Sequence, residues 1–353
     1  MSIITVVGSG MMGSALAVPA TDNGHEVRLV GTHLDRAIIE SLKRDVFHPT
    51  LKMKMPARVK AFFLEEIDAA MEGCDLAICG VSSFGVTWFA REAMPHIPDS
   101  VPVLSVTKGL EDLPDGTLLT LPEVLRRNLP PGRHPSLNAI GGACTSYELA
   151  QRHQTVVCFC GPDLAVLERF QKALGTSYYH IRCSTDVVGV ESAVALKNAY
   201  ALGVSFAIGM QERLDGVGCV ESYNTQAALF GQSVREMRRL LALLGGGPDE
   251  IDLGASDLYV TIFGGRTRKL GILLGRGLAF RQAREELAGV TLESVEIATR
   301  TARAVRNLAR RGVVRLEDFP LMMHVDAVLN GGSPVAIPWD SFTGSTVTDF
   351  HRS

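Results

Sequence analysis

The chain has 353 residues, of which 46% are hydrophobic and 21% charged, and its formal net charge at pH 7 is -3. This length accommodates two domains with separate cores, and the composition is typical of an ordinary soluble globular protein. Because acidic and basic residues are mixed along the chain, no basic block predicts a nucleic-acid interface, and an anionic substrate would need a local basic pocket.

The seven cysteines are scattered without any paired CxxC spacing, so we interpret them as free thiols in a reducing compartment. No histidine lies at ligand spacing to them, so we expect no zinc and no other metal. No charged region precedes the first apolar run, and no stretch of about twenty apolar residues lacks charges or helix breakers. We therefore expect a cytoplasmic protein without a secretory signal or a membrane span.

The first predicted elements are a strand, a glycine-rich turn, a helix and a second strand. The β-branched run 2–7 predicts a strand buried on both faces, and 26–30 predicts the next strand. Residues 11–22 have helical composition, although Pro19 is expected to kink the helix. Parallel strands require such a crossover helix, so this stretch predicts a β-α-β unit.

Strands and helices continue to alternate through the first half of the chain. Further strands are predicted at 58–63, 75–81, 101–106, 137–142, 155–161 and 177–183. Alternation at this spacing predicts an α/β fold with a doubly wound sheet of the Rossmann type.

Gly8, Gly10 and Gly13 form a GxGxxG pattern between the first strand and its helix. Gly8 would allow a tight turn, Gly10 would let a pyrophosphate approach the main chain, and Gly13 would let the helix pack close to the strand. The N-terminus of the helix would supply N–H donors and partial positive charge to the phosphates. The alternative interpretation is a glycine turn without a ligand.

The residues after the second strand leave the choice between NAD and NADP open. A carboxylate at the strand end would bind the adenosine ribose and favour NAD, but the stretch "GTHLDR" has no acid before Asp35. Arg36 could bind a 2′-phosphate, or it could be an ordinary solvated charge on a helix.

The second half of the chain predicts helices. Lys197 lies near the centre of the apolar stretch 189–214, where it would either extend to water or be held in a cleft as an acid. Asp257 and Thr261 are four residues apart and would share one face of a helix. The tail 331–353 has prolines and hydroxyls but no helical period, which predicts an extended or disordered segment.

Arg266 and Thr267 follow a pair of glycines and would stand at a helix N-terminus. Main-chain N–H groups, a hydroxyl and a forked guanidinium together suit a phosphate monoester. The alternative is a basic surface turn.

Several stretches resemble one known family, in family order and at family-like spacing, along nearly the whole chain. They are "GSGMMGSALA", "NGHEVRLVG", "VTKGLE", "GGACTSYELA", "DVVGVESAVALKN", "NTQAAL", "ASDLYVTIFGGRTRK" and "LESVEIATRTARAV". On these motifs the chain resembles the NAD(P)-dependent glycerol-3-phosphate dehydrogenases.

The resemblance implies a Rossmann domain at 1–185, an all-helical domain at 186–330 and a site in the cleft between them. It also implies NAD or NADP as cofactor, a homodimer, and reversible reduction of dihydroxyacetone phosphate to sn-glycerol 3-phosphate.

The resemblance further implies roles for individual residues. Lys197 matches the catalytic lysine and is expected to protonate the carbonyl oxygen, with Asp257 orienting it, while Lys108 would stabilise the oxyanion. The expected substrate-binding residues are Lys108, Asn198, Asp257, Thr261, Arg266 and Thr267. The expected cofactor-binding residues are Gly8, Ser9, Gly10, Met11, Met12, Gly13, Thr32, His33, Arg36, Val81, Lys108, Ser146, Arg266 and Glu293.

Two positions depart from the family pattern. Thr267 stands where the family has asparagine beside its phosphate-binding arginine, and Ser82-Ser83 stands where it commonly has a proline. A polyol phosphate of four to five carbons is therefore an alternative substrate, and a 3-hydroxyacid dehydrogenase is a further alternative. A redox sensor or binding module that holds a dinucleotide without catalysis would need none of Lys108, Lys197 and Asp257, and no feature favours a structural scaffold.

Overall fold

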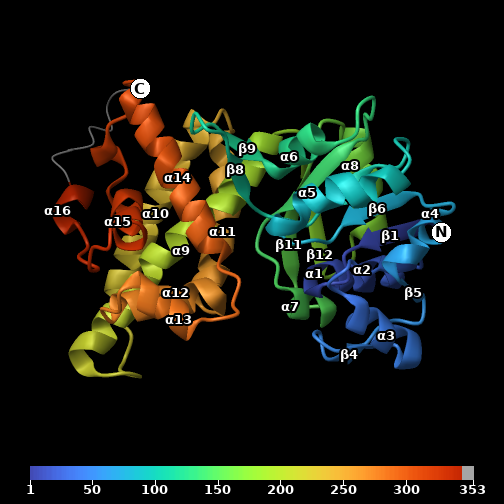
Figure 1. Ribbon diagram of the computed structural model, residues 1–353, viewed down its shortest axis with the longest axis horizontal. Coiled ribbons are helices and arrows are strands. Elements are labelled where there is room, and N and C mark those ends of the chain that lie inside the picture. The colour runs from blue at the N-terminus through green and yellow to red at the C-terminus, as the bar shows by residue number, and fades with distance from the viewer. Residues whose placement is uncertain (344–353) are drawn as a thin grey trace. The chain divides into compact units, whose positions relative to one another are not determined.

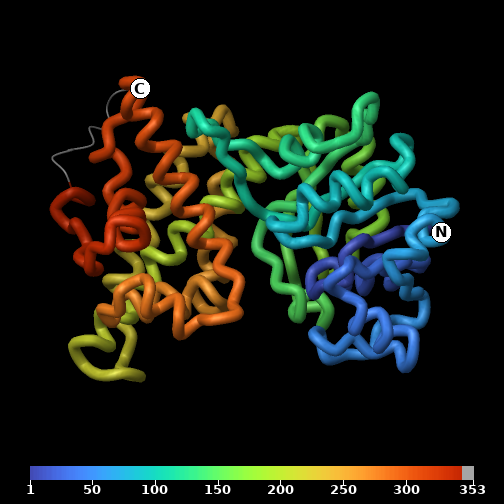
Figure 2. The backbone as a smooth tube through the Cα atoms, viewed as in Figure 1, coloured from blue at the N-terminus to red at the C-terminus, as the bar shows by residue number. Residues whose placement is uncertain are grey.

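The computed structural model describes residues 1–343 and divides the chain into two compact units. Unit 1 comprises Met1–Glu111, Leu119–Ala195 and Leu241–Asp257. Among the described residues, unit 2 comprises Asp112–Leu118, Leu196–Leu240 and 258–343. Figure 2 follows the chain through both from blue to red. The sequence predicted a single domain boundary near residue 185. In the structure, two short segments pack with the other unit than their sequence neighbours: Asp112–Leu118 with unit 2 and Leu241–Asp257 with unit 1.

Unit 1 is built on an eight-stranded sheet with the order β12-β11-β10-β7-β6-β1-β2-β5. Figure 1 labels β1, β5, β6, β11 and β12 of this sheet. The strands are β1 (Ile3–Val7), β2 (Glu26–Val30), β5 (Val59–Phe62), β6 (Leu76–Cys79), β7 (Val103–Ser105), β10 (Leu137–Gly141), β11 (Thr155–Cys160) and β12 (Tyr179–Ser184). The predicted doubly wound α/β sheet is thereby confirmed.

One pair of neighbouring strands in this sheet is antiparallel. β10 and β11 run in opposite directions, with Ala139 opposite Cys160, while the other paired neighbours are parallel. Antiparallel neighbours need no crossover helix, so the short helix α7 (Ser146–Ala150) and its flanking loops suffice between them. The uniform alternation seen in the sequence did not predict this reversal.

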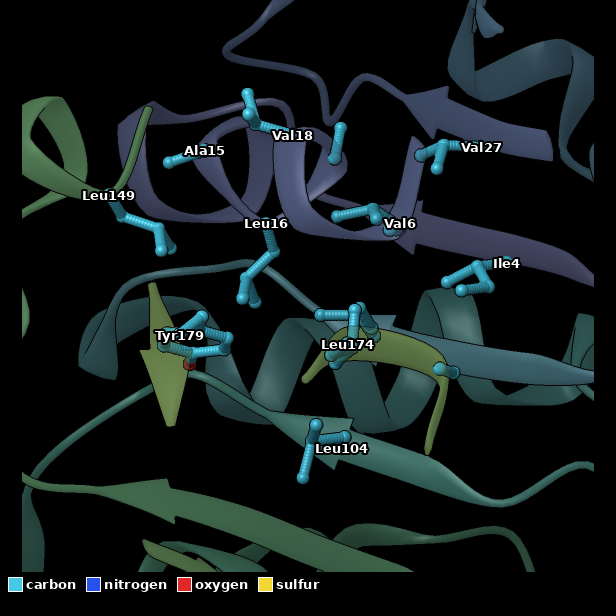
Figure 3. Close-up of a cluster of buried hydrophobic side chains, with 14 of the residues drawn as sticks. Ile4, Val6, Ala15, Leu16, Val18, Val27, Leu104, Leu149, Leu174 and Tyr179 are labelled. Carbon is cyan, nitrogen blue, oxygen red and sulfur yellow. The ribbon is translucent and has the colours of Figure 1, made fainter. Parts of the chain in front are cut away.

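Helices cover both faces of the sheet. One face carries α1 (Met11–Ala15), α2 (Ala17–Asp22), α3 (Arg36–Asp45), α7 and α8 (Leu164–Leu174). The other carries α4 (Ile67–Met71), α5 (Val86–Trp88), a π-helical turn at Phe89–Ala93, and α6 (Leu121–Asn128). Figure 3 shows the hydrophobic core between the sheet and the first of these faces. Leu16, the N-cap residue of α2, and Leu174 of α8 belong to this core together with Val6 of β1.

The helix predicted over residues 11–22 is divided into α1 and α2, which meet at Leu16. Pro19 has no N–H to donate to the carbonyl of Ala15, so the regular ladder is interrupted in this turn. The N–H of Ala20 donates to Leu16 O over 3.3 Å. The expected kink is thus present as a short break.

Unit 2 is helical. It contains most of α10 (Tyr223–Leu243), then α12 (Gly265–Gly275), α13 (Phe280–Glu286), α14 (Glu293–Arg310), α15 (Pro320–Leu329) and α16 (Trp339–Phe342). The long helix α9 (Val187–Asp215) and α11 (Ile251–Ile262) each contribute their later turns. Glycines let α9 and α12 approach closely, since a Cβ on Gly271 would lie 2.5 Å from the Cβ of Ser205.

By length and composition, α9 is the one helix in the described part of the chain that could cross a membrane. Most of its apolar window is buried inside the protein, which is typical of a core helix.

The described part of the predicted tail is partly helical. Val335 and Ile337 are buried, and Trp339 packs edge-on against Phe342 within α16, with ring centroids 5.5 Å apart. These apolar contacts order a stretch whose composition predicted an extended or disordered segment. Residues 344–353 of that prediction lie outside the described residues.

Two small hairpins were not predicted. They pair β3 (Phe47–His48) with β4 (Met53–Lys54), and β8 (Leu110–Asp112) with β9 (Leu118–Thr120). Strands of two or three residues are too short to show a period in the sequence.

Three glycine backbones meet where β1 and β6 end. Gly8 has φ +107°, and a Cβ on it would lie 2.6 Å from the carbonyl carbon of Gly80. A Cβ on Gly13 would lie 2.4 Å from Gly8 O, and one on Gly80 would lie 2.5 Å from the same oxygen. The tight turn and the close helix packing predicted for Gly8 and Gly13 are therefore present, and Gly80 is their unpredicted third member.

We expect Gly80→Ala to destabilise the protein by about 3 kcal/mol, because the clash is with backbone rather than with a movable side chain. The melting temperature, measured by circular dichroism, should fall by several degrees. Gly231→Ala is the matched control, since Gly231 lies in α10 without a positive φ, and a Cβ there would meet no atom within 4 Å. Equal melting temperatures for Gly80→Ala and the wild type would contradict the close-contact argument.

Candidate active site

Within the glycine motif, Gly10 alone lacks a packing reason for being glycine. The nearest atom to a Cβ on Gly10 would be Gly80 O at 4.0 Å, an ordinary contact, whereas Gly8 and Gly13 are forced to be glycine by their neighbours. The space above Gly10 is therefore available to a ligand that approaches the main chain, as a pyrophosphate does at the start of a Rossmann helix.

The loop backbone is fixed by side chains that the motif does not include. Oδ2 of Asp35 accepts hydrogen bonds from the N–H of Ser9 at 3.2 Å, the N–H of Thr32 at 2.9 Å and the hydroxyl of Thr32 at 2.8 Å. Ser9 O accepts from the Ser14 hydroxyl at 3.1 Å and lies 3.0 Å from Nε2 of the buried His48. Asp35 thus ties the end of β2 to the glycine loop.

Burial lowers the pKa of His48 below 6.5, so the imidazole is neutral at pH 7. A neutral ring adds no charge beside the loop. The sequence carried no signal for this role, because His48 is distant from the motif and lies in a two-residue strand.

The predicted residues for the adenosine end follow β2. The ring of His33 packs against Trp88, with centroids 5.4 Å apart. Arg36 is the first residue of α3, and its guanidinium lies 4.9 Å from the centroid of Phe63 and 3.3 Å from Glu65. The side chain is largely exposed, so both interpretations of Arg36 remain compatible with its position.

Predicted cofactor residues follow the carboxyl ends of four adjacent parallel strands. Gly8 follows β1, Thr32 follows β2, Val81 follows β6 and Lys108 follows β7, and the sheet order is β7-β6-β1-β2. In open α/β sheets, ligands bind outside this edge. The fold therefore brings these residues to the edge where a dinucleotide would lie.

Three more predicted cofactor residues lie at the starts of helices on this unit. Met11 is exposed and Met12 half-buried at the first turn of α1, and Ser146 is the first residue of α7.

Nothing in residues 1–343 gathers three His, Cys, Asp or Glu side chains that could hold a metal ion.

Lys108 forms a buried ion pair that the sequence did not predict. Its Nζ donates to Oδ2 of Asp257 at 2.6 Å and to Gly142 O at 2.5 Å. The Asp257 side chain is only 4% exposed and that of Lys108 19%, so water screens their attraction weakly. Such a pair is costly to break, because removal of one partner leaves a buried charge without compensation.

Burial raises the pKa of the nearby Cys144 thiol to about 12. Lys108 opposes this rise and Asp257 adds to it. Cys144 is consequently a protonated thiol at neutral pH, which argues against covalent catalysis by this cysteine.

Lys197 lies in the middle of α9, where it is half-buried. Its Nζ donates to the hydroxyl oxygen of Thr261 at 2.7 Å. This hydrogen bond favours the interpretation that the ammonium is held in place over the alternative that it extends to water. The half-buried Asn198 follows it on the same helix.

A single helix, α11, supplies a side-chain partner to each of the two lysines. Asp257, which pairs with Lys108, and Thr261, which accepts from Lys197, are one turn apart on this helix. The sequence predicted this shared face. These two hydrogen bonds join residues 149 and 64 positions apart, so the local pattern could not predict them.

Arg266 and Thr267 are the second and third residues of α12, as their position after two glycines predicted. The Arg266 side chain is exposed, and its Nη2 lies 4.0 Å from Oε2 of Glu293, the first residue of α14. Two predicted ligand residues of unit 2, Arg266 and Glu293, are thus brought together.

Comparisons with known proteins cover nearly the whole chain. Residues 3–166 match the family model described as the N-terminus of NAD-dependent glycerol-3-phosphate dehydrogenase, and residues 186–338 match the model of its C-terminus. The chain belongs to this family. The fold and family predicted from the sequence are confirmed, and so is the expected cofactor class of NAD or NADP.

Relatives within the glycerol-3-phosphate dehydrogenase family differ in the cofactor that their names print. The NADP(+)-dependent glycerol-3-phosphate dehydrogenase of Archaeoglobus fulgidus is 35% identical over 288 residues, covering 81% of this chain and 83% of its own. The glycerol-3-phosphate dehydrogenase [NAD(P)+] of Myxococcus xanthus is 32% identical over 318 residues, covering 88% and 89%.

Solved structures of the family share the fold. Glycerol-3-phosphate dehydrogenase from Coxiella burnetii superposes with a TM-score of 0.76 at 22% identity and covers 97% of both chains. The Plasmodium falciparum structure gives a TM-score of 0.81 at 17% identity, covering 99% of this chain and 97% of its own.

We expect Asp257→Asn to destabilise the protein by about 3 kcal/mol, because it leaves the Lys108 ammonium buried without its counter-charge. Thermal unfolding would measure the loss, and Asp252→Asn, an exposed position on the same helix, is the control. In a double-mutant cycle, Lys108→Met combined with Asp257→Asn should cost less than the sum of the single changes. Simple additivity would show that the pair contributes no coupling.

Proposed function

We propose that the protein catalyses the reversible reduction of dihydroxyacetone phosphate to sn-glycerol 3-phosphate with NADH or NADPH. The observation that carries this proposal is on α11, where one turn supplies a carboxylate to Lys108 and a hydroxyl to Lys197. Two oriented ammonium groups suit a reaction that develops negative charge on a ketone oxygen. Membership of the family supports the substrate and cofactor classes.

The residues fit a dinucleotide, because Gly10 lies in the turn between β1 and α1 and a Cβ there would have no neighbour closer than 4.0 Å. The glycine loop would hold the pyrophosphate, and Thr32, His33 and Arg36 would bind the adenosine end. When bound, the reduced nicotinamide supplies the hydride. The remaining chemistry belongs to the side chains of this chain.

Lys197 donates a proton to the carbonyl oxygen of the substrate. Its hydrogen bond to Thr261 fixes the direction of the ammonium, and Asp257 on the preceding turn of α11 supports the positive charge. General acid catalysis of this kind contributes roughly 10²- to 10⁴-fold to the rate. In the reverse reaction, the neutral amine of Lys197 accepts the proton of the alcohol.

Lys108 stabilises the oxyanion as it develops. Its ammonium is oriented before reaction by Asp257 and Gly142, so little reorganisation is required when charge appears on the substrate. Its low exposure strengthens this electrostatic effect.

Arg266 and Thr267 bind the phosphate of the substrate. The guanidinium offers a forked pair of donors, and the N–H groups of the first turn of α12 add the positive end of an eleven-residue helix. Asn198, next to Lys197, hydrogen-bonds a substrate hydroxyl. The shorter threonine in place of asparagine leaves room for a polyol phosphate of four to five carbons as an alternative substrate.

We also propose that the protein acts as a cytoplasmic homodimer. Its seven cysteines are all free thiols, which suits a reducing compartment. The dimer rests on the family resemblance, and light scattering of the purified protein would test it.

Lys197→Ala should lower kcat for dihydroxyacetone phosphate by about 10²- to 10⁴-fold, because the proton donor is lost. Turnover is measured by oxidation of NADH and of NADPH, with circular dichroism to establish that the variant is folded. The exposed Lys172→Ala on α8 should retain wild-type turnover. A folded Lys197→Ala variant with near wild-type kcat would show that Lys197 is not the general acid.

Arg266→Ala should raise the KM for dihydroxyacetone phosphate by about tenfold to a hundredfold, since a charge-assisted hydrogen bond contributes about 1.5–3 kcal/mol. Arg281→Ala, an almost fully exposed position on α13, is the control. Four- and five-carbon ketose phosphates and short 3-keto acids serve as competing substrates in the same assay. An unchanged KM in Arg266→Ala would show that Arg266 does not bind the substrate phosphate. A preference for a 3-keto acid would overturn the proposed substrate class.

A further inference from the structure

Glu191 is a buried carboxyl group that the proposed mechanism does not use. It lies on α9 within unit 1 and is fully buried. Neither of its carboxyl oxygens has a hydrogen-bonding partner of ordinary geometry among the described residues. Since buried polar groups in proteins are nearly always hydrogen-bonded, this side chain requires an explanation.

The second deeply buried glutamate of the chain shows the usual arrangement. Glu236 accepts hydrogen bonds from the Tyr200 hydroxyl and from the N–H groups of Leu321 and Met322, at 2.8 to 3.0 Å. Its carboxyl thereby caps the N-terminus of α15, a structural role. Glu191 has no comparable set of donors, because the one N–H that acts on it, that of Leu121 at the start of α6, makes no hydrogen bond of ordinary geometry.

Main-chain packing brings Glu191 near Lys108. A Cβ on Gly141 would lie 2.4 Å from Cγ1 of Val190, the residue before Glu191. Lys108 donates to the carbonyl of the next residue, Gly142, and its ammonium is the charged group that acts on Glu191.

Burial raises the pKa of Glu191 to about 8, and the Lys108 ammonium and the Leu121 N–H of α6 oppose the rise. From β11, the Cys160 thiol also faces Glu191, and burial keeps its pKa well above 9, so it carries no charge near neutral pH. Glu191 is accordingly a neutral acid at pH 7.

We propose that Glu191, whose buried carboxyl has no hydrogen-bonding partner of ordinary geometry, is a positioning residue for the reduction and acts through Lys108. The inference rests on the proposed role of Lys108. With Glu191 neutral, the Lys108 ammonium is paired with the Asp257 carboxylate, and its remaining field acts on the developing oxyanion. When Glu191 loses its proton to solvent, a second carboxylate charge opposes that field.

Ionisation of Glu191 should change kcat, because Lys108 acts on charge that develops in the transition state. For the wild type, kcat for ketone reduction should fall on the order of tenfold between pH 7 and pH 9.5, the equivalent of about one pKa unit of interaction. Glu191→Gln has the same shape and cannot ionise, so this ratio should shrink to about twofold or less. Glu191→Asp can still ionise and should restore the alkaline decrease.

Glu168→Gln, an exposed position on α8, is the control and should show the wild-type profile. Equal alkaline decreases in the wild type and in Glu191→Gln would overturn the inference while leaving the proposed reaction intact. Absence of dihydroxyacetone phosphate reduction by the wild type at every pH would instead be the failure of the proposed function.

Stability supplies a readout that needs no substrate. Because the pKa of Glu191 is raised on folding, its protonated form favours the folded state. This contribution is complete below the unfolded pKa of about 4.5 and is lost as the pH rises through about 8. The melting temperature of the wild type should therefore fall relative to that of Glu191→Gln between pH 5 and pH 8. Parallel curves would show that Glu191 does not titrate in this range, which would also overturn the inference.

Discussion

The meeting of three glycine backbones is the constraint on which the rest of unit 1 depends. Gly8, Gly13 and Gly80 bring the ends of β1 and β6 and the first turns of the helical segment after β1 to the closest approach that main chains permit. A side chain at any of them would separate these elements. The same contact fixes the strand edge from which Thr32, Val81 and Lys108 emerge, so a packing requirement inside the fold also sets the spacing of the candidate ligand residues.

Buried charge is the second organising feature. The Lys108–Asp257 pair, the carboxyl of Glu191 and the ammonium of Lys197 lie on or beside elements of low exposure, where electrostatic interactions are stronger than in water. Orientation of the ammonium groups by Asp257 and Thr261 is established before any substrate binds. Burial of these polar groups lowers the stability of the protein, and under the proposed function their orientation would stabilise a charge that exists only during reaction.

Local patterns predicted the sheet and the glycine turn, because strand alternation and GxGxxG are properties of neighbouring residues. They also placed Arg266 at a helix start and put Asp257 and Thr261 on one helix face. Contacts between distant segments were beyond this kind of inference. The reversal at β10–β11, the hydrogen bonds from Asp35 to the loop, the partner of Lys108 and the isolation of Glu191 all depend on how separate segments pack. An acid within an apolar run was the one sequence signal that could have drawn attention to Glu191.

Segments of the two units alternate along the sequence, and this has a consequence for synthesis on the ribosome. Ala139, Cys158 and Cys160 of the sheet are covered by Val190 and Val194 of α9 and by Leu253 of α11. The segment that carries Leu253 is made long after the last strand, so a nascent chain ending near residue 185 leaves this apolar surface uncovered. Vectorial folding of the first half cannot reach completion until residue 257 has emerged, and a fragment cut at the apparent midpoint would be prone to aggregate.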